Sequence, residues 1–189
     1  MKRVKLSQII ALIIAIILYI LSVFFGFYMV SGDSMEPSFY NGDEGIYLKG
    51  RFAHIKEGDV VLVHDPDTDE GIIKRCVAVG GDTVSMEKGI LLVNGEEVEE
   101  DYTLVPMGEH DDIAEVTLNA NEIYVMGDNR GKSYDSRLFG ALNKDSVDGV
   151  SVINLSKHGL NREIIIFVIV LAFFVALFTS LFQRRKEDE

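Results

Sequence analysis

The amino-acid sequence predicts a mainly β domain, largely antiparallel, flanked by an N-terminal and a C-terminal transmembrane helix. Two long runs carry no charged residue: residues 6–30, with 25 residues, and residues 164–182, with 19. Between them lie short runs rich in β-branched residues and bounded by Gly, Pro, Asn and Asp, which is typical of strands and turns. No comparable helical periodicity occurs between the two runs, so the segment that separates them is predicted to consist mainly of strands.

Both uncharged runs have the length of membrane spans. Each is close to the ~20 residues that a helix needs to cross a hydrocarbon core of about 30 Å. Basic residues lie between each run and the nearer end of the chain: Lys2, Arg3 and Lys5 before the first run, and Arg184, Arg185 and Lys186 after the second. Positive flanks stay on the cytoplasmic side, so both termini are expected in the cytoplasm and the protein is expected to be a multi-pass protein of the cell membrane. A cleavable signal also starts with basic residues, but its apolar region spans only about 7–15 residues, so an uncleaved anchor is favoured.

The expected organisation therefore has five parts. They are a cytoplasmic N-terminus (1–5), a transmembrane anchor (6–30), an extracytoplasmic β domain (31–163), a second transmembrane helix (164–182) and a cytoplasmic tail (183–189). The absence of a repeat or low-complexity linker indicates that the outer segment is one domain.

The outer segment is strongly acidic. Residues 31–162 carry 12 Lys and Arg residues against 26 Asp and Glu, a net charge of −14. Such a surface disfavours nucleic acid and anionic lipid headgroups as partners, and most of these charges are expected to keep the domain soluble. Cys76 is the only cysteine, which excludes an internal disulfide and a cysteine-based metal site.

Four runs in this segment are predicted strands: residues 58–66, 71–81, 90–98 and 122–129. The third contains Asn94-Gly95, the strongest short signal for a β-hairpin. Residues 96–122 are rich in Asp and Glu and are interpreted as a surface excursion between strands.

Ser34, in the stretch GDSMEPS, follows the first uncharged run by four residues. It is either a linker residue or a nucleophile, and a nucleophilic serine needs a base. The four histidines are interpreted as surface or edge-strand residues, because none of them lies in GDSMEPS or in the other hydrophilic stretches named below: His54, His64, His110 and His158. There is no Gly-x-Ser-x-Gly elbow.

Lys74 is the alternative base, because it stands inside the apolar strand IIKRCVAV. Strand alternation places Ile72, Lys74 and Cys76 on one face, where poor hydration disfavours the charged amine and lowers the lysine pKa. A neutral lysine can accept the serine proton. The competing interpretation is a lysine at a sheet edge whose amine reaches water.

Other motifs fit less well. The Gly-Asp-Ser triplet is followed by Met35-Glu36, whereas trypsin-like sites have Gly-Gly, and lipase-like sites need a downstream histidine. The acidic stretch at 65–71 has Glu70 and Cys76 where a calcium-binding loop needs Gly and Glu, so it is interpreted as an acidic turn.

Taken together and in this order, the stretches GDSMEPS, GDVVLV, IIKRCVAVGGDTV and GDNRGKSYDSRLFG resemble the bacterial type I signal peptidases, which are membrane-bound Ser-Lys endopeptidases. The resemblance covers residues 6–155 and implies that Ser34 is the nucleophile, that Lys74 is the general base and that Ser133 orients the lysine amine. It also implies that Asp128, Asp135, Ser136 and Arg137 shape the site and that Met35, Phe39 and Ile73 line shallow substrate pockets. The implied fold is a largely antiparallel β domain with an apolar surface that rests on the membrane lipid.

The implied substrates are the signal peptides of secretory pre-proteins, cut after a small-x-small site, and no metal or organic cofactor is expected. Gly32 is a departure, because some relatives have an oxyanion-binding serine there; the oxyanion hole is therefore expected to use backbone N–H groups, including that of Ser34. The second span is another departure. The alternatives are a Ser-Lys protease with a dedicated substrate and a non-catalytic membrane-anchored adaptor.

Overall fold

The computed structural model describes residues 6–103 and 112–155 of the chain. The chain divides into two compact units, of which one contains helix α1 (Leu6–Phe24) and the other comprises residues 25–154. The expected second membrane span at 164–182 lies outside the described residues, as do residues 1–5, the tail at 183–189 and the histidines His110 and His158.

Helix α1 is shorter than the expected anchor. Its 19 residues extend over about 28 Å at 1.5 Å per residue, close to the hydrocarbon thickness of a bilayer. The uncharged run continues to Val30, but residues 25–29 form strand β1 (Phe25–Met29) and belong to the β unit. The expected boundaries at residues 30 and 31 therefore differ from the structure. Gly26 explains part of the difference, because a Cβ there would overlap the ring of Tyr47 on the neighbouring strand.

The remaining elements are mostly short strands. Besides α1 and β1 they are β2 (Glu44–Lys49), η1 (Gly50–Phe52), β3 (Val60–His64), β4 (Gly71–Val79), β5 (Thr83–Glu87), β6 (Ile90–Val93), β7 (Glu96–Glu97), β8 (Ile113–Thr117), β9 (Glu122–Met126), η2 (Arg130–Lys132), α2 (Ser136–Phe139), β10 (Leu142–Asn143), η3 (Lys144–Ser146) and β11 (Val147–Asn154). The four strands predicted from the sequence correspond to β3, β4, the β6–β7 hairpin and β9. The prediction of a mainly antiparallel β domain is confirmed.

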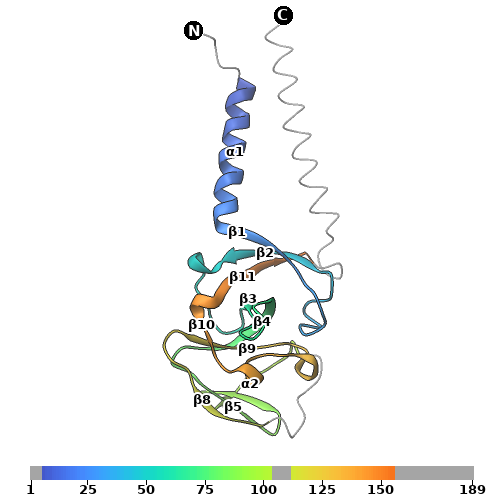
Figure 1. Ribbon diagram of the computed structural model, residues 1–189, viewed down its shortest axis with the longest axis vertical. Helices are drawn as coiled ribbons and strands as arrows, with labels where there is room; N and C mark the ends of the chain where they lie inside the picture. The colour runs from blue at the N-terminus through green and yellow to red at the C-terminus, as the bar shows by residue number, and fades with distance from the viewer. Residues whose placement is uncertain (1–5, 104–111, 156–189) are drawn as a thin grey trace, which may run out of the picture. The chain divides into compact units, whose positions relative to one another are not determined.

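Seven strands form the larger sheet, in the order β1-β2-β11-β3-β4-β9-β10, and every neighbouring pair is antiparallel (Figure 1). The long strand β4 pairs with β3 from Gly71 to Arg75, and with β9 from Arg75 to Val79. The half of β4 that contains Lys74 therefore has no strand beside it on the β9 side, within the ranges that the structure covers.

Four strands form the smaller sheet, in the order β7-β6-β5-β8. Figure 1 labels β5 and β8 of this sheet. Asn94 and Gly95 form the predicted tight turn between β6 and β7, with φ of 55° and 78°, which suits a hairpin turn that requires positive φ. Strand β8 lies within the segment that the sequence analysis interpreted as a surface excursion. It pairs with β5, so part of that segment belongs to the sheet.

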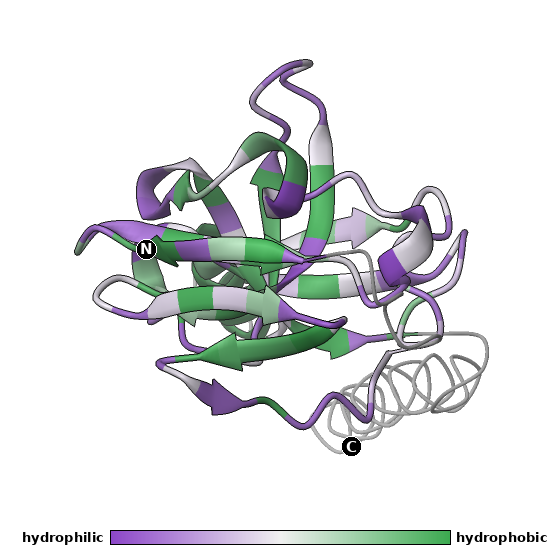
Figure 2. Cartoon of the chain, turned by 90° about the horizontal axis from the view of Figure 1, so that it is seen from below, coloured by the Kyte–Doolittle hydropathy of each residue, from purple (hydrophilic) through white to green (hydrophobic). Residues whose placement is uncertain are grey.

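Strands β4 and β9 are shared by two hydrophobic cores, because their alternate residues point to opposite faces. On β9, Tyr124 and Met126 pack with the smaller sheet, whereas Ile123 and Val125 pack against β3 and β11. Figure 2 shows that hydrophobic residues are concentrated on the strands and hydrophilic ones on the connecting loops. Strand β4 and the loop that leaves the end of β9 are thus supported by a buried framework.

Candidate active site

Ser34 lies in a tight loop that follows β1. The loop is closed at its base, where the N–H of Val30 donates to the carbonyl of Asp43 (2.7 Å) and the N–H of Gly42 donates to that of Val30 (2.8 Å). Met35 and Phe39 anchor it in a small core with Val30, at 1% and 7% exposure. These contacts fix the backbone on both sides of Ser34.

Met35 and Phe39 therefore serve the loop itself, and they are not among the residues that line the groove beside Ser34. Ile73 does line that groove and also packs on the same small core. The structure thus places one of the three predicted pocket residues at the groove, and the role of all three in substrate binding stays a prediction.

Lys74 meets Ser34 although 40 residues separate them in the sequence. The Nζ atom of Lys74 lies 2.9 Å from Oγ of Ser34 and 3.0 Å from the carbonyl oxygen of Ile73. Only 4% of Lys74 is exposed, because β4 carries it between β3 and the Ser34 loop. The competing interpretation, a lysine whose amine reaches water at a sheet edge, does not fit this burial.

Burial lowers the pKa of Lys74 below its ordinary value of 10.5. The carboxylates of Asp135, Asp65 and Asp128 act in the opposite direction and Arg137 in the same direction, and the net effect is a lowered pKa. The geometry and the electrostatics together allow a neutral amine to accept the proton of a hydroxyl that it already contacts.

The loop after β9 supports the Ser34 loop from one side. The backbone N–H of Asn129 donates to the carbonyl of Ser34 at 3.0 Å, and its side-chain Nδ2 donates to the carbonyl of Asp33 at 3.0 Å. Gly127 sits so close that a Cβ on it would overlap both the carbonyl oxygen of Ser34 and the hydroxyl of Ser133. The glycine is therefore required by contact between the two loops.

The predicted residues Asp128, Asp135, Ser136 and Arg137 hold this loop in place. Asp135, which is fully buried, accepts hydrogen bonds from the N–H of Gly127 (2.9 Å) and from Arg137 (2.7 and 2.8 Å). Burial alone would raise the pKa of Asp135, but Arg137 and the N–H of Gly127 outweigh it and hold the pKa low. Ser136 joins α2 to β9, because its Oγ accepts the N–H of Val125 at 3.0 Å.

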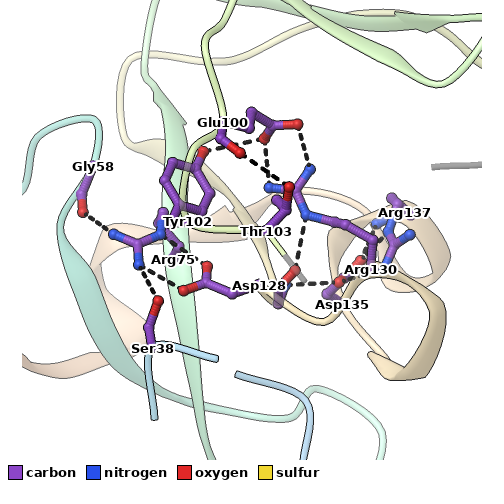
Figure 3. A network of polar contacts seen from close by, with 11 residues as sticks. Ser38, Gly58, Arg75, Glu100, Tyr102, Thr103, Asp128, Arg130, Asp135 and Arg137 are labelled. Carbon is purple, nitrogen blue, oxygen red and sulfur yellow. Dashed lines mark hydrogen bonds and ion pairs between the residues drawn. The ribbon is translucent and has the colours of Figure 1, made fainter. Parts of the chain in front are cut away.

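Asp128 forms a two-pronged ion pair with Arg75, the residue next to Lys74. Nε and Nη2 of Arg75 lie 2.8 Å and 2.6 Å from the two carboxylate oxygens of Asp128, and Nη1 donates to the carbonyl of Gly58 at 2.9 Å (Figure 3). The carboxylate is fully buried, so the pair is shielded from water. It ties the loop after β9 to the strand that carries the lysine.

Figure 3 shows a second layer behind this pair, centred on Tyr102. The guanidinium groups of Arg75 and Arg130 lie 4.1 Å and 5.9 Å from the centre of the Tyr102 ring, within the range of cation–π attraction. Arg130 is almost fully buried, pairs with Glu100 at 2.5 Å and donates from Nε to the carbonyl of Gly127 at 2.8 Å. The segment around residues 100–102 thus braces the active-site loop.

Sequence reasoning missed Arg75, Asn129, Arg130, Glu100 and Tyr102. Arg75, Asn129 and Arg130 lie inside the stretches that carry the family resemblance, so their position could have marked them as candidate site residues. Glu100 and Tyr102 gave none, because they lie in an acidic segment that looked like surface and reach the site only through the fold.

Ser133 does not make the contact predicted for it. Its Oγ is buried and forms no hydrogen bond with Lys74, so the expected contact is absent from this structure; instead the Ser133 hydroxyl contributes to the lowered pKa of Asp135. The side chain packs against Gly127, beside the Ser34 carbonyl. Its orienting role remains a prediction.

A groove of about 330 Å³ opens beside the pair of reactive groups. Residues from β1, the loop that follows it, β3, β4 and the start of β11 line it: Tyr28, Met29, Ser31, Ser34, Leu62, Gly71, Ile72, Ile73, Lys74 and Asp148. The lining is mixed: apolar residues such as Leu62 and Ile72 lie beside the polar residues Ser31, Ser34, Lys74 and Asp148.

The other candidate groups in the described ranges do not contact Ser34 or Lys74. Cys76 is fully buried in the core with Val61 and Val125, and burial raises the pKa of its thiol to about 12, so it acts as a small hydrophobe and not as a thiol nucleophile. His54 is exposed, and His64 lies within 2.9 Å of the Asp148 carboxylate. Asp65 closes the acidic turn by accepting the N–H groups of Asp67 and Thr68.

Known proteins resemble this chain over most of its length. The family model described as signal peptidase, peptidase S26, matches residues 3–155. Signal peptidase I of Bacillus licheniformis is 34% identical over 154 residues, which is 75% of this chain and 83% of that protein. Signal peptidase I S of Bacillus subtilis (strain 168) is 34% identical over 156 residues, with 75% and 83% covered.

A crystal structure of a signal peptidase I from Enterococcus faecalis V583 aligns with a TM-score of 0.47 at 28% identity, covering 52% of this chain and 97% of that one. The family match alone spans the described β unit and helix α1 and includes every residue of the site. With the serine, the buried lysine and the bracing loop in place, the chain belongs to the signal peptidase family, peptidase S26.

Proposed function

We propose that the protein is a membrane-bound serine endopeptidase that removes N-terminal signal peptides from secretory precursors, with Ser34 as nucleophile and Lys74 as general base. The observation that carries the assignment of residues is the 2.9 Å contact between Nζ of the buried Lys74 and Oγ of Ser34. In a chain of this family, that contact supplies both the nucleophile and the base that activates it.

Acylation begins when neutral Lys74 accepts the Ser34 proton. Oγ of Ser34 forms a bond to the scissile carbonyl carbon, and the carbonyl oxygen becomes an oxyanion. As the intermediate collapses, the C–N bond breaks and the leaving amine takes the proton from the Lys74 ammonium. The signal peptide remains as an acyl ester on Ser34.

Deacylation uses the same lysine. Neutral Lys74 accepts a proton from a water molecule, whose oxygen attacks the ester carbonyl. The C–Oγ bond then breaks, and Ser34 recovers its proton from Lys74, so the enzyme returns to its starting state. No metal or organic cofactor takes part in these steps.

The substrate binds as an extended strand beside β4. Gly71–Lys74 lacks a neighbouring strand on the β9 side within the described ranges, and residues of the same stretch line the groove that contains Ser34. An added strand would pair with the backbone of this stretch, as in other cases of strand addition. Its −1 and −3 side chains would lie in shallow pockets at the groove, which favours small residues at both positions.

A strip of apolar side chains on β1, β2 and β11 supports contact with membrane lipid. Phe27, Ile46 and Ile153 are opposite one another in register and so share a face, and Met29 follows Phe27 on it. Phe27 is 82% exposed and Met29 71%. Strand β1 directly follows α1 in the sequence, so the strip belongs to the part of the β unit nearest the proposed membrane anchor along the chain.

The membrane topology completes the proposal. Helix α1 and residues 164–182 cross the membrane, residues 25–163 lie on the extracytoplasmic face and both basic termini lie in the cytoplasm. A signal peptide has its cleavage site just outside its own apolar core. An enzyme anchored in the same membrane therefore meets that bond with much of the positional entropy of binding already removed.

Cleavage of a purified secretory precursor with an Ala-x-Ala site tests this function. The full chain in detergent is incubated with the precursor, and the N-terminus of the product is sequenced, with Ser34→Ala as the matched control. We expect cleavage after the −1 alanine by the wild type only. A wild type that cuts membrane-anchored proteins but no signal peptide would indicate a dedicated substrate, and an inactive one would indicate an adaptor.

A further inference from the structure

The peptide unit between Asp33 and Ser34 has an unequal set of partners. Its carbonyl accepts two hydrogen bonds, from Nδ2 of Asn129 at 3.0 Å and from the N–H of Glu36 at 3.2 Å. Its N–H, which belongs to Ser34, donates to no group within the residues that the structure describes. The carbonyl side of the peptide is thus held by two donors, while the N–H side is available to bind a substrate atom beside the Ser34 hydroxyl.

A free N–H on the nucleophile is placed to bind the oxyanion that forms on the scissile carbonyl. The side chain at position 32 cannot help, because that residue is glycine, with φ of 90°. The backbone donor of Ser34 therefore carries a larger share of oxyanion binding than it would beside a serine at position 32.

The planarity of the peptide links its two sides. Because the six atoms of the unit lie in one plane, the orientation of the Asp33 carbonyl also sets the direction of the Ser34 N–H. A hydrogen bond to the carbonyl further polarises the unit and strengthens the N–H as a donor. The amide of Asn129 acts on both properties without contacting the substrate.

The side chain of Asn129 makes this contact instead of capping the helix that follows it. It precedes the short helix η2, where an asparagine side chain often caps the helix, yet its side chain makes no capping bond. The residue is only 4% exposed, and its own N–H holds the carbonyl of Ser34. Its neighbours Asp128 and Arg130 are fixed by the ion pairs with Arg75 and Glu100.

We propose that Asn129 is a positioning residue for catalysis, whose side-chain amide orients the Asp33–Ser34 peptide so that the N–H of Ser34 binds the oxyanion. This inference rests on the proposed role of Ser34 as nucleophile. It assigns to Asn129 an effect on the transition state that is separate from folding and from the basicity of Lys74.

The test compares Asn129→Ala and Asn129→Leu, which both lack the donor, with Asn121→Ala. Asn121 is an exposed asparagine of the same domain whose amide donates to Asn143 and Asp145, away from the site. Each variant, as the full chain in detergent, is assayed for thermal unfolding and for kcat and KM on an Ala-x-Ala peptide. Binding of a peptide boronate, which forms a tetrahedral adduct with a serine, is measured beside binding of the cleaved product peptide.

Removing one direct oxyanion donor lowers kcat by about 10²–10³, and for loss of its positioning we expect about 10–10² with little change in KM. In the Asn129 variants, boronate affinity should fall by the same factor as kcat/KM, while product-peptide affinity and the pH at which activity is lost in acid should stay unchanged. The Asn121→Ala variant should match the wild type in all of these measurements. Unchanged kcat in folded Asn129→Leu, or equal losses of boronate and product affinity, would overturn the proposal. If Ser34→Ala still cleaves, the nucleophile assignment has failed instead.

If both Asn129 variants fail to fold, the residue is a structural one and the proposal is wrong. A melting temperature close to that of the wild type in either variant makes the kinetic comparison decisive.

Discussion

The amine of Lys74 is 2.9 Å from the hydroxyl of Ser34 and is nearly sealed from solvent, with 4% of the residue exposed. The two residues lie on different parts of the chain: Ser34 in a closed loop after β1, and Lys74 in strand β4. Their contact depends on the loop after β9, which holds the Ser34 backbone from one side and the strand of Lys74, through Arg75, from the other.

Activity should fall as the pH is lowered, because the reaction needs the neutral amine. The pKa of Lys74 is lowered from 10.5 by burial, so the neutral fraction is high above the lowered pKa and drops about tenfold per pH unit below it. The pH dependence of kcat/KM should therefore show a single acidic limb below pH 10.5. A limb at the ordinary lysine pKa would contradict a buried base.

Asp65→Asn should move this limb to lower pH. The carboxylate of Asp65 raises the pKa of Lys74, so its removal lowers that pKa further. Asparagine can still accept the two turn N–H groups through Oδ1, which preserves the Asp65 turn. The same pH series on this variant checks the direction, and a shift to higher pH would show that the assignment of the charge effect is wrong.

Asp128→Ala should destabilise the β unit. It leaves the guanidinium of Arg75, 13% exposed, without its buried partner, and breaking such a pair typically costs about 3–5 kcal/mol. Denaturant unfolding of the full chain measures this loss. Lys132→Ala removes an exposed ion pair with Asp33 and serves as the control, with little expected change. Equal losses in the two variants would refute the special role of the buried pair.

Gly127→Ala should reduce kcat by more than tenfold while Gly131→Ala leaves it near wild type. A Cβ at 127 would overlap Ser133 and the carbonyl of Ser34, so the Ser34 loop must move, and a misplacement of about 1 Å can cost about 10² in rate. A Cβ at 131 meets no atom within 4 Å. Steady-state kinetics on both variants, with melting curves, separate displacement of the loop from unfolding; equal activity would contradict the tight contact.

Local sequence signals were sufficient for much of the β unit. Gly, Asn and Asp mark the ends of β3, β4 and β9, and Asn94-Gly95 fixes the register of the β6–β7 hairpin through its positive φ angles. Lys74 could be recognised as a candidate base because a lysine inside an apolar strand is poorly hydrated. Local chemistry made Lys74 one of two interpretations of the base for Ser34, and the family resemblance favoured it, since no local rule shows that residues 40 positions apart meet.

The boundary at β1 could not be read from hydropathy. Phe25–Met29 is as uncharged as the helix before it, and what distinguishes it is pairing with β2, with Gly26 beneath the ring of Tyr47. The bracing by Tyr102 and Glu100 was equally hidden, because an acidic segment looks like solvated surface until the fold brings two arginines to it. Both features depend on tertiary contacts rather than on local preference.

The central claim is that a neutral lysine activates Ser34, and Lys74→Arg tests it most directly. Arginine keeps the positive charge and much of the length of lysine but cannot lose its proton at accessible pH, so it cannot act as a base. The measurement is the rate of precursor cleavage, with the product N-terminus sequenced, for the wild type, Lys74→Arg, Lys74→Ala and Ser34→Ala. We predict that only the wild type cleaves, and that both lysine variants are as inactive as Ser34→Ala. Cleavage by the arginine variant at a rate near that of the wild type would contradict the account.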